Sequence, residues 1–83
     1  MKFLHISDLH LGKIINEYSM LEDQRYILSQ IFHMAEENAV DGILIAGDIY
    51  DRSIPSVEAV ELFDEFLYRL EQSRISVYII PGN

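Results

Sequence analysis

The sequence predicts an α/β domain with the element order β-α-β-α-β. Three short apolar runs bounded by turn residues indicate strands, and two longer segments with apolar residues at helical spacing separate them. Strands that alternate with helices of this length are typical of a parallel sheet joined by right-handed crossovers. The 83 residues, of which 49% are hydrophobic, suffice for one small globular domain.

The expected strands cover residues 2–7, 42–47 and 75–80. The first, KFLHIS, is bounded by Asp8, and the second, GILIAG, is a short apolar run that begins and ends with glycine. The third, ISVYII, is rich in β-branched and aromatic residues and ends at a Pro-Gly pair.

The expected helices cover residues 19–38 and 55–72. Ser19 and Glu22 have the spacing of a capping box at a helix start, and Asn38 marks the end of that helix. Pro55 suits the first position of the second helix. The apolar residues expected to face the core are Met20, Ile27, Leu28, Ile31, Phe32, Met34, Ala35, Val60, Phe63, Leu67 and Leu70.

The charge balance narrows the functional classes. Fourteen acidic and six basic residues give a net charge of -8, which argues against gripping nucleic acid through a basic surface of this chain. The same balance fits a site where bound cations supply positive charge. The chain has no cysteine, which excludes disulfides and thiolate metal sites. No signal-peptide core and no membrane-length apolar run is present, so we expect a cytoplasmic protein without a membrane partner.

Metal-ligating residue types follow each predicted strand. Asp8 and His10 follow the first, Asp48 the second and Asn83 the third. In parallel sheets, ligands bind at the carboxyl ends of the strands. Asp8 and His10 flank a single residue, so in an extended segment their side chains leave on the same side and could reach one ion.

This donor set favours a metal centre over the simpler alternatives. Each motif alone is more often a turn or a helix-leading loop, but three at the exits of one sheet favour metal binding. Carboxylate, imidazole and amide donors suit Mn²⁺, Fe or Zn better than Mg²⁺. Two cations about 3.5–4 Å apart, bridged by Asp48, would clamp a phosphate and activate a water. Arg52 either holds a phosphate or pairs with Asp51.

The motifs resemble a known family. DLH at 8–10, GDIYDR at 47–52 and GN at 82–83 resemble the calcineurin-like metallophosphoesterases, whose pattern is D-x-H, G-D-x-x-D-R and G-N-H-D/E. LEDQ at 21–24 and DRSIPSVEAV at 51–60 are similar to the DNA double-strand-break repair nuclease branch. The resemblance implies that residues 1–83 are the leading β-α-β-α-β portion of that family's sandwich and an amino-terminal fragment of its nuclease domain.

The resemblance also implies roles for individual residues. Two divalent ions, Mn²⁺ in this branch, would be bound, with Asp48 bridging them and with Asp51 and Arg52 in support of catalysis. The family's catalytic histidine would lie beyond Asn83, so residues 1–83 alone are expected to be inactive. The metal ligands implied are Asp8, His10, Asp48 and Asn83.

The implied function is hydrolysis of phosphodiester bonds at DNA ends and hairpins, in DNA repair, recombination and replication. The implied partners are DNA and an ATPase subunit, in a dimer or heterocomplex. Two other functions stay open: a calcineurin-like phosphodiesterase or phosphatase that acts on small molecules, and a non-catalytic interaction module with solvated carboxylates.

Overall fold

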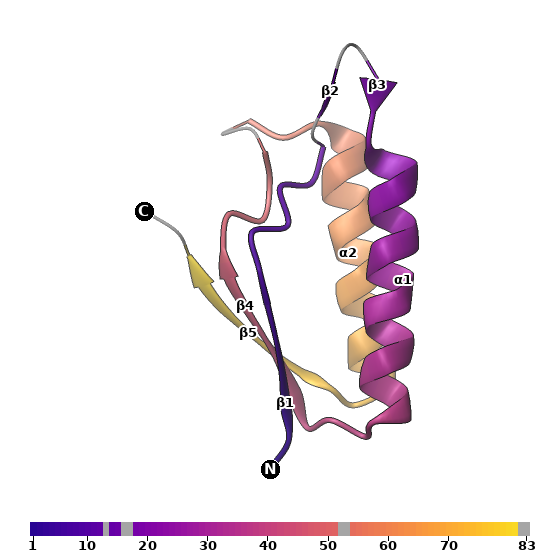
Figure 1. The fold of residues 1–83 in the computed structure, drawn as a ribbon, viewed down its shortest axis with the longest axis vertical. Helices are drawn as coiled ribbons and strands as arrows, with labels where there is room; N and C mark the ends of the chain where they lie inside the picture. The colour runs from indigo at the N-terminus through magenta and orange to yellow at the C-terminus, as the bar shows by residue number, and fades with distance from the viewer. Residues whose placement is uncertain (13, 16–17, 52–53, 82–83) are drawn as a thin grey trace.

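The computed structural model describes residues 1–12, 14–15, 18–51 and 54–81. The predicted β-α-β-α-β order is confirmed, with one short hairpin added between the first strand and the first helix (Figure 1). In chain order the elements are β1 (Phe3–Ser7), β2 (Ile14–Ile15), β3 (Tyr18–Ser19), α1 (Leu21–Glu37), β4 (Gly42–Gly47), α2 (Val57–Gln72) and β5 (Ser76–Pro81).

The main sheet is parallel and has β4 at its centre, between β1 and β5. Ser7 pairs with Ala46, and Gly47 pairs with Pro81, so the three strands end at the same edge of the sheet. Right-handed crossovers that move across a sheet in one direction place their helices on one face. Figure 1 shows α1 and α2 side by side on one face of the sheet.

The hydrophobic core lies between the helices and this covered face. Ile43 and Ile45 of the central strand are 0% exposed. The predictions for Ile27 and Met34 are wrong, since each side chain is 50% exposed. Burial is confirmed for the predicted helix residues Leu28, Phe32, Ala35, Phe63 and Leu70, and it extends to three helix residues that were not predicted, Ala59, Leu62 and Phe66.

The helices begin differently from the sequence predictions. Ser19 is the last residue of β3, and the N-cap of α1 is Met20, which makes no side-chain capping hydrogen bond. The capping-box prediction is therefore wrong. The second helix begins at Val57, and the Ser56 hydroxyl accepts a hydrogen bond from the Ala59 N–H at 3.2 Å. Pro55 precedes this cap instead of occupying the first helical position.

Both helices end in the same hydrogen-bonded turn with a left-handed residue. After α1, Ala39 (φ 49°) donates to the Glu36 carbonyl, and Val40 donates to the Ala35 carbonyl, each at 3.1 Å. After α2, Arg74 (φ 60°) takes the equivalent place. This pattern is the Schellman motif, in which glycine is the preferred left-handed residue. The chain therefore places two side chains where glycine would be less strained.

Replacing Ala39 with glycine is expected to stabilise the protein by about 1 kcal/mol, because glycine adopts positive φ without the steric cost of a Cβ. The urea midpoint measures the change. Ala35→Gly is the matched control: Ala35 lies inside α1 and is 0% exposed, so that replacement should destabilise. A lower midpoint for Ala39→Gly would contradict the assignment.

Candidate metal centre

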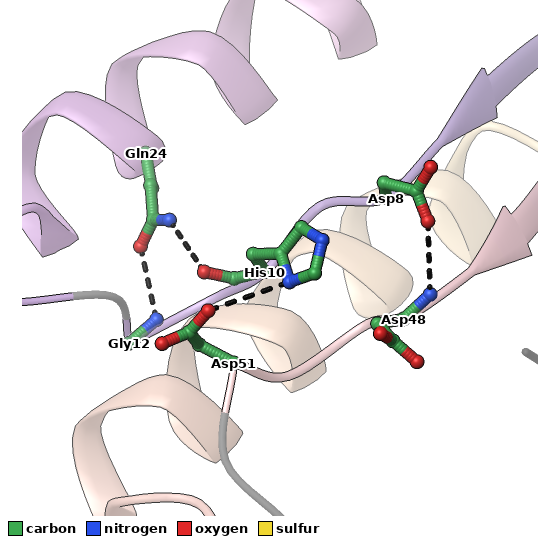
Figure 2. Close-up of polar contacts among 6 residues, drawn as sticks. All are labelled: Asp8, His10, Gly12, Gln24, Asp48 and Asp51. Carbon is green, nitrogen blue, oxygen red and sulfur yellow. Dashed lines mark hydrogen bonds and ion pairs between the residues drawn. The ribbon is translucent and has the colours of Figure 1, made fainter.

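The candidate site lies beyond the ends of β1 and β4, on the first exit loop (residues 8–12) and the second exit loop (residues 48–51). The Asp8 N–H donates to the Ala46 carbonyl at 2.9 Å, which extends the strand pairing past Ser7. The Asp48 N–H donates to Oδ1 of Asp8 at 3.3 Å (Figure 2). The Asp8 carboxylate therefore ties the start of one exit loop to the start of the other.

Gly47 makes this close approach possible. Its φ is 85°, which is in the left-handed region that favours glycine. A Cβ at position 47 would overlap Oδ1 of Asp8 and lie 2.9 Å from the Asp8 Cγ. The Gly-Asp pair at 47–48 therefore creates the space into which the Asp8 side chain fits.

The first exit loop is not extended, so the geometry expected for Asp8 and His10 is wrong. Asp8 has φ 54° and His10 has φ 48°, and both are left-handed. Asp and His are among the residues that adopt this region most readily after glycine and asparagine. Such conformations persist where surrounding contacts hold them, and they are concentrated at functional sites. The two side chains consequently take separate partners.

The partner of the His10 ring is the Asp51 carboxylate. Nδ1 of His10 lies 3.4 Å from Oδ1 of Asp51 (Figure 2), and the two side chains are 38% and 32% exposed. A carboxylate beside Nδ1 favours a proton on that nitrogen and leaves Nε2 as the nitrogen with a free lone pair. This arrangement is the one by which outer carboxylates orient metal-ligating histidines.

The two exit loops run side by side through their backbones. The Leu11 N–H donates to the Ile49 carbonyl at 2.8 Å, and the Asp51 N–H donates to the Leu11 carbonyl at 2.9 Å. The Leu11 side chain is 2% exposed and belongs to the core. The polar residues on both loops are thus presented from a backbone that is anchored in the hydrophobic interior.

Tyr50 separates the second exit loop from α2. Its ring makes an edge-to-face contact with Phe63, with 5.9 Å between centroids. Burial raises the pKa of the Tyr50 phenol, and the Asp64 carboxylate acts in the same direction. The phenol therefore stays protonated at neutral pH and can act as a hydrogen-bond donor.

The structure brings the described site residues together in two pairs: Asp8 with Asp48, and His10 with Asp51. Arg52 and Asn83, also predicted as site residues, lie outside the described residues. Within the described ranges, no group of three His, Asp or Glu side chains is close enough to hold a metal ion by itself.

Gln24 contributes to the site although no role was predicted for it. From the first turn of α1, its Oε1 accepts from the Gly12 N–H at 3.0 Å, and its Nε2 donates to the His10 carbonyl at 2.8 Å (Figure 2). The only signal in the sequence is the LEDQ segment, which carries the resemblance to the nuclease branch but indicates no contact.

Among the described residues, no helix combines the length and apolar character needed to cross a membrane.

Comparison with known proteins agrees with this geometry. The calcineurin-like phosphoesterase family matches residues 1–83. The chain is 46% identical over 84 residues to the SbcD subunit of the nuclease SbcCD from Staphylococcus epidermidis. That alignment covers 100% of this chain and 22% of the relative, so the chain spans about a fifth of the relative's length. With a whole-chain family match and a parallel sheet that carries the family's motifs at its strand exits, the chain belongs to the calcineurin-like phosphoesterases.

Proposed function

We propose that residues 1–83 are the amino-terminal part of the nuclease domain of a metal-dependent DNA nuclease. The observation that carries the proposal is the convergence of Asp8, His10 and Asp48 on two adjoining exit loops. The similarity to a relative named as part of a nuclease supports DNA as the substrate.

The donors on the exit loops fit a divalent cation. Both Asp8 and Asp48 are exposed carboxylates, and the His10 ring has its Nδ1 side facing Asp51, which favours Nε2 as a ligand. Carboxylate and imidazole donors suit Mn²⁺. We propose two Mn²⁺ ions, with Asp8 and His10 on the first, Asn83 on the second and Asp48 bridging both. When bound, the ions would supply Lewis acidity and positive charge to a phosphodiester and its attacking water.

The chain's own residues prepare this site. The Asp48 N–H holds the Asp8 carboxylate, and the Asp51 carboxylate sets the direction of the His10 ring. Arg52 is proposed to support the loop or hold a substrate phosphate. With a net charge of -8, the chain depends on bound cations to accept the phosphates of DNA.

The wider role follows the same relative. Its name makes it one part of the SbcCD complex, which supports a dimer or heterocomplex with an SbcC-like ATPase. We propose cytoplasmic action at DNA ends and hairpins during repair, recombination and replication. Residues 1–83 alone are proposed to be inactive.

The experiment uses the full-length polypeptide with Mn²⁺, both alone and with its ATPase partner. The substrates are linear duplex DNA, a DNA hairpin, closed circular DNA and a chromogenic phosphodiester. Degradation of linear and hairpin DNA with circles spared is the expected result. Turnover of the chromogenic ester alone would assign a small-molecule phosphodiesterase, and turnover of none would favour the interaction module.

Replacing Asp51 with asparagine is expected to weaken Mn²⁺ binding about tenfold, because loss of an outer carboxylate partner typically reduces metal affinity by that order or more. The asparagine keeps the size of the side chain but removes the charge that faces Nδ1 of His10. Calorimetric titration with Mn²⁺ measures the change. Asp23→Asn, an exposed residue in the first turn of α1, is the control. Equal affinity in both variants would contradict the orienting role.

A further inference from the structure

The first exit loop has backbone groups that face away from its neighbour. The Leu11 N–H and carbonyl pair with the second exit loop, whereas the His10 carbonyl and the Gly12 N–H turn toward α1. The described part of the chain has no strand beside the loop on that side. The Gln24 side-chain amide bonds to both groups, with the acceptor toward the N–H and the donor toward the carbonyl. Its amide therefore takes the place that the edge of a neighbouring strand would occupy.

We propose that Gln24 is a positioning residue for the metal centre, because it clamps the backbone of the first exit loop in the conformation that presents Asp8 and His10. The inference rests on the proposed metal-binding function. Gln24 touches neither metal nor substrate in this account. It acts through the His10 carbonyl and the Gly12 N–H.

The loop needs such a clamp because its backbone is strained. Asp8, His10 and Gly12 have φ values of 54°, 48° and 87°, so three left-handed residues lie within five positions. Non-glycine residues in this region cost on the order of 1–3 kcal/mol each and persist only where several contacts fix them. The buried Leu11 side chain and the second exit loop supply part of that restraint. Gln24 supplies the rest from the other side.

The chemistry of the clamp selects an amide. The two backbone groups have opposite polarity, so one side chain satisfies both only if it carries a donor and an acceptor side by side. Carboxylate, ammonium and aliphatic side chains each leave at least one group without its partner. On the opposite flank, a Cβ at Gly12 would lie 3.2 Å from the Ala59 Cβ, so α2 restricts the loop there. The loop is thereby held between both helices.

The test compares Gln24→Met with Gln30→Met in the full-length protein. Methionine matches glutamine in length and helix propensity but makes neither clamp bond. Gln30 is an exposed glutamine on the same helix, and its Nε2 donates only to the Tyr26 hydroxyl, at 2.9 Å. Two quantities are measured: amide hydrogen exchange in peptides covering residues 8–12, and Mn²⁺ affinity by calorimetric titration.

For Gln24→Met, exchange is expected to accelerate in residues 8–12 and stay unchanged in β4 and β5, while Mn²⁺ affinity falls about tenfold. Gln30→Met should match the wild type in both measurements. Identical behaviour of the two variants overturns the proposal. Faster exchange throughout the chain also overturns it, because that result indicates general destabilisation.

Faster local exchange with unchanged Mn²⁺ affinity shows a clamp that does not position the metal centre, and it too overturns the proposal. Failure of the proposed function is recognised separately, since the wild type itself would then bind no Mn²⁺. In that case the metal-positioning role falls with it, and the exchange data still decide whether Gln24 clamps the loop.

Discussion

Replacing Gly47 with alanine is expected to destabilise the protein by about 2–4 kcal/mol and to abolish Mn²⁺ binding at the exit loops. Two costs add at this position. A residue with a Cβ is strained at φ 85°, and that Cβ overlaps the Asp8 carboxylate. The carboxylate must move, which breaks its bond from the Asp48 N–H and separates the two acidic residues from their paired arrangement.

A double-mutant cycle separates the two costs. With Asp8→Ala as background, the carboxylate is gone, and Gly47→Ala should then cost only the backbone strain, about 1–2 kcal/mol. Chemical denaturation gives each free energy of unfolding, and titration gives Mn²⁺ affinity. If Gly47→Ala cost as much in the Asp8→Ala background as in the wild type, the clash between position 47 and Asp8 would not be the cause.

Replacing Asp48 with asparagine is expected to lower Mn²⁺-dependent DNA hydrolysis by roughly 10³-fold or more, because a bridging carboxylate contributes several kcal/mol through the cations it holds. Asparagine keeps the backbone N–H that binds Asp8 but removes the charge and one bridging oxygen. In metal-free protein, stability should stay equal or rise, since a negative charge near Asp8 is lost.

The matched control for this variant lies at the other end of the same strand. Asp41 precedes β4 and accepts a hydrogen bond from the Lys2 N–H at 2.8 Å, far from the exit loops. Asp41→Asn should leave hydrolysis near the wild-type rate. Comparable activity in Asp48→Asn and Asp41→Asn would remove Asp48 from the proposed metal centre.

The strands and the order of elements were predictable because they depend on local pattern. The GILIAG run gives β4 with the predicted limits, since its apolar character and flanking glycines fix it locally. The motif spacing also placed Asp8, His10, Asp48 and Asp51 on the correct two loops. These predictions needed only the rule that parallel strands end at one edge.

The geometry within the loops was not predictable in the same way. The left-handed conformations of Asp8 and His10 depend on contacts with segments about 40 positions away in the chain, such as the Asp48 N–H and the Asp51 carboxylate. The role of Gln24 depends on how α1 packs beside the loop, and the sequence contains no periodic signal for it. The start of α1 was mispredicted because Ser19 is drawn into the β2–β3 hairpin.

The most direct test of the metal centre is electron paramagnetic resonance of the full-length protein titrated with Mn²⁺. Two Mn²⁺ per chain with a spin-coupled spectrum are expected for the wild type, since a bridging carboxylate brings the ions to about 3.5–4 Å. Asp48→Asn should lose the coupling and at least one ion, whereas Asp41→Asn should retain both. Uncoupled or absent Mn²⁺ in the wild type, or an unchanged coupled pair in Asp48→Asn, would contradict a metal centre built on these exit loops.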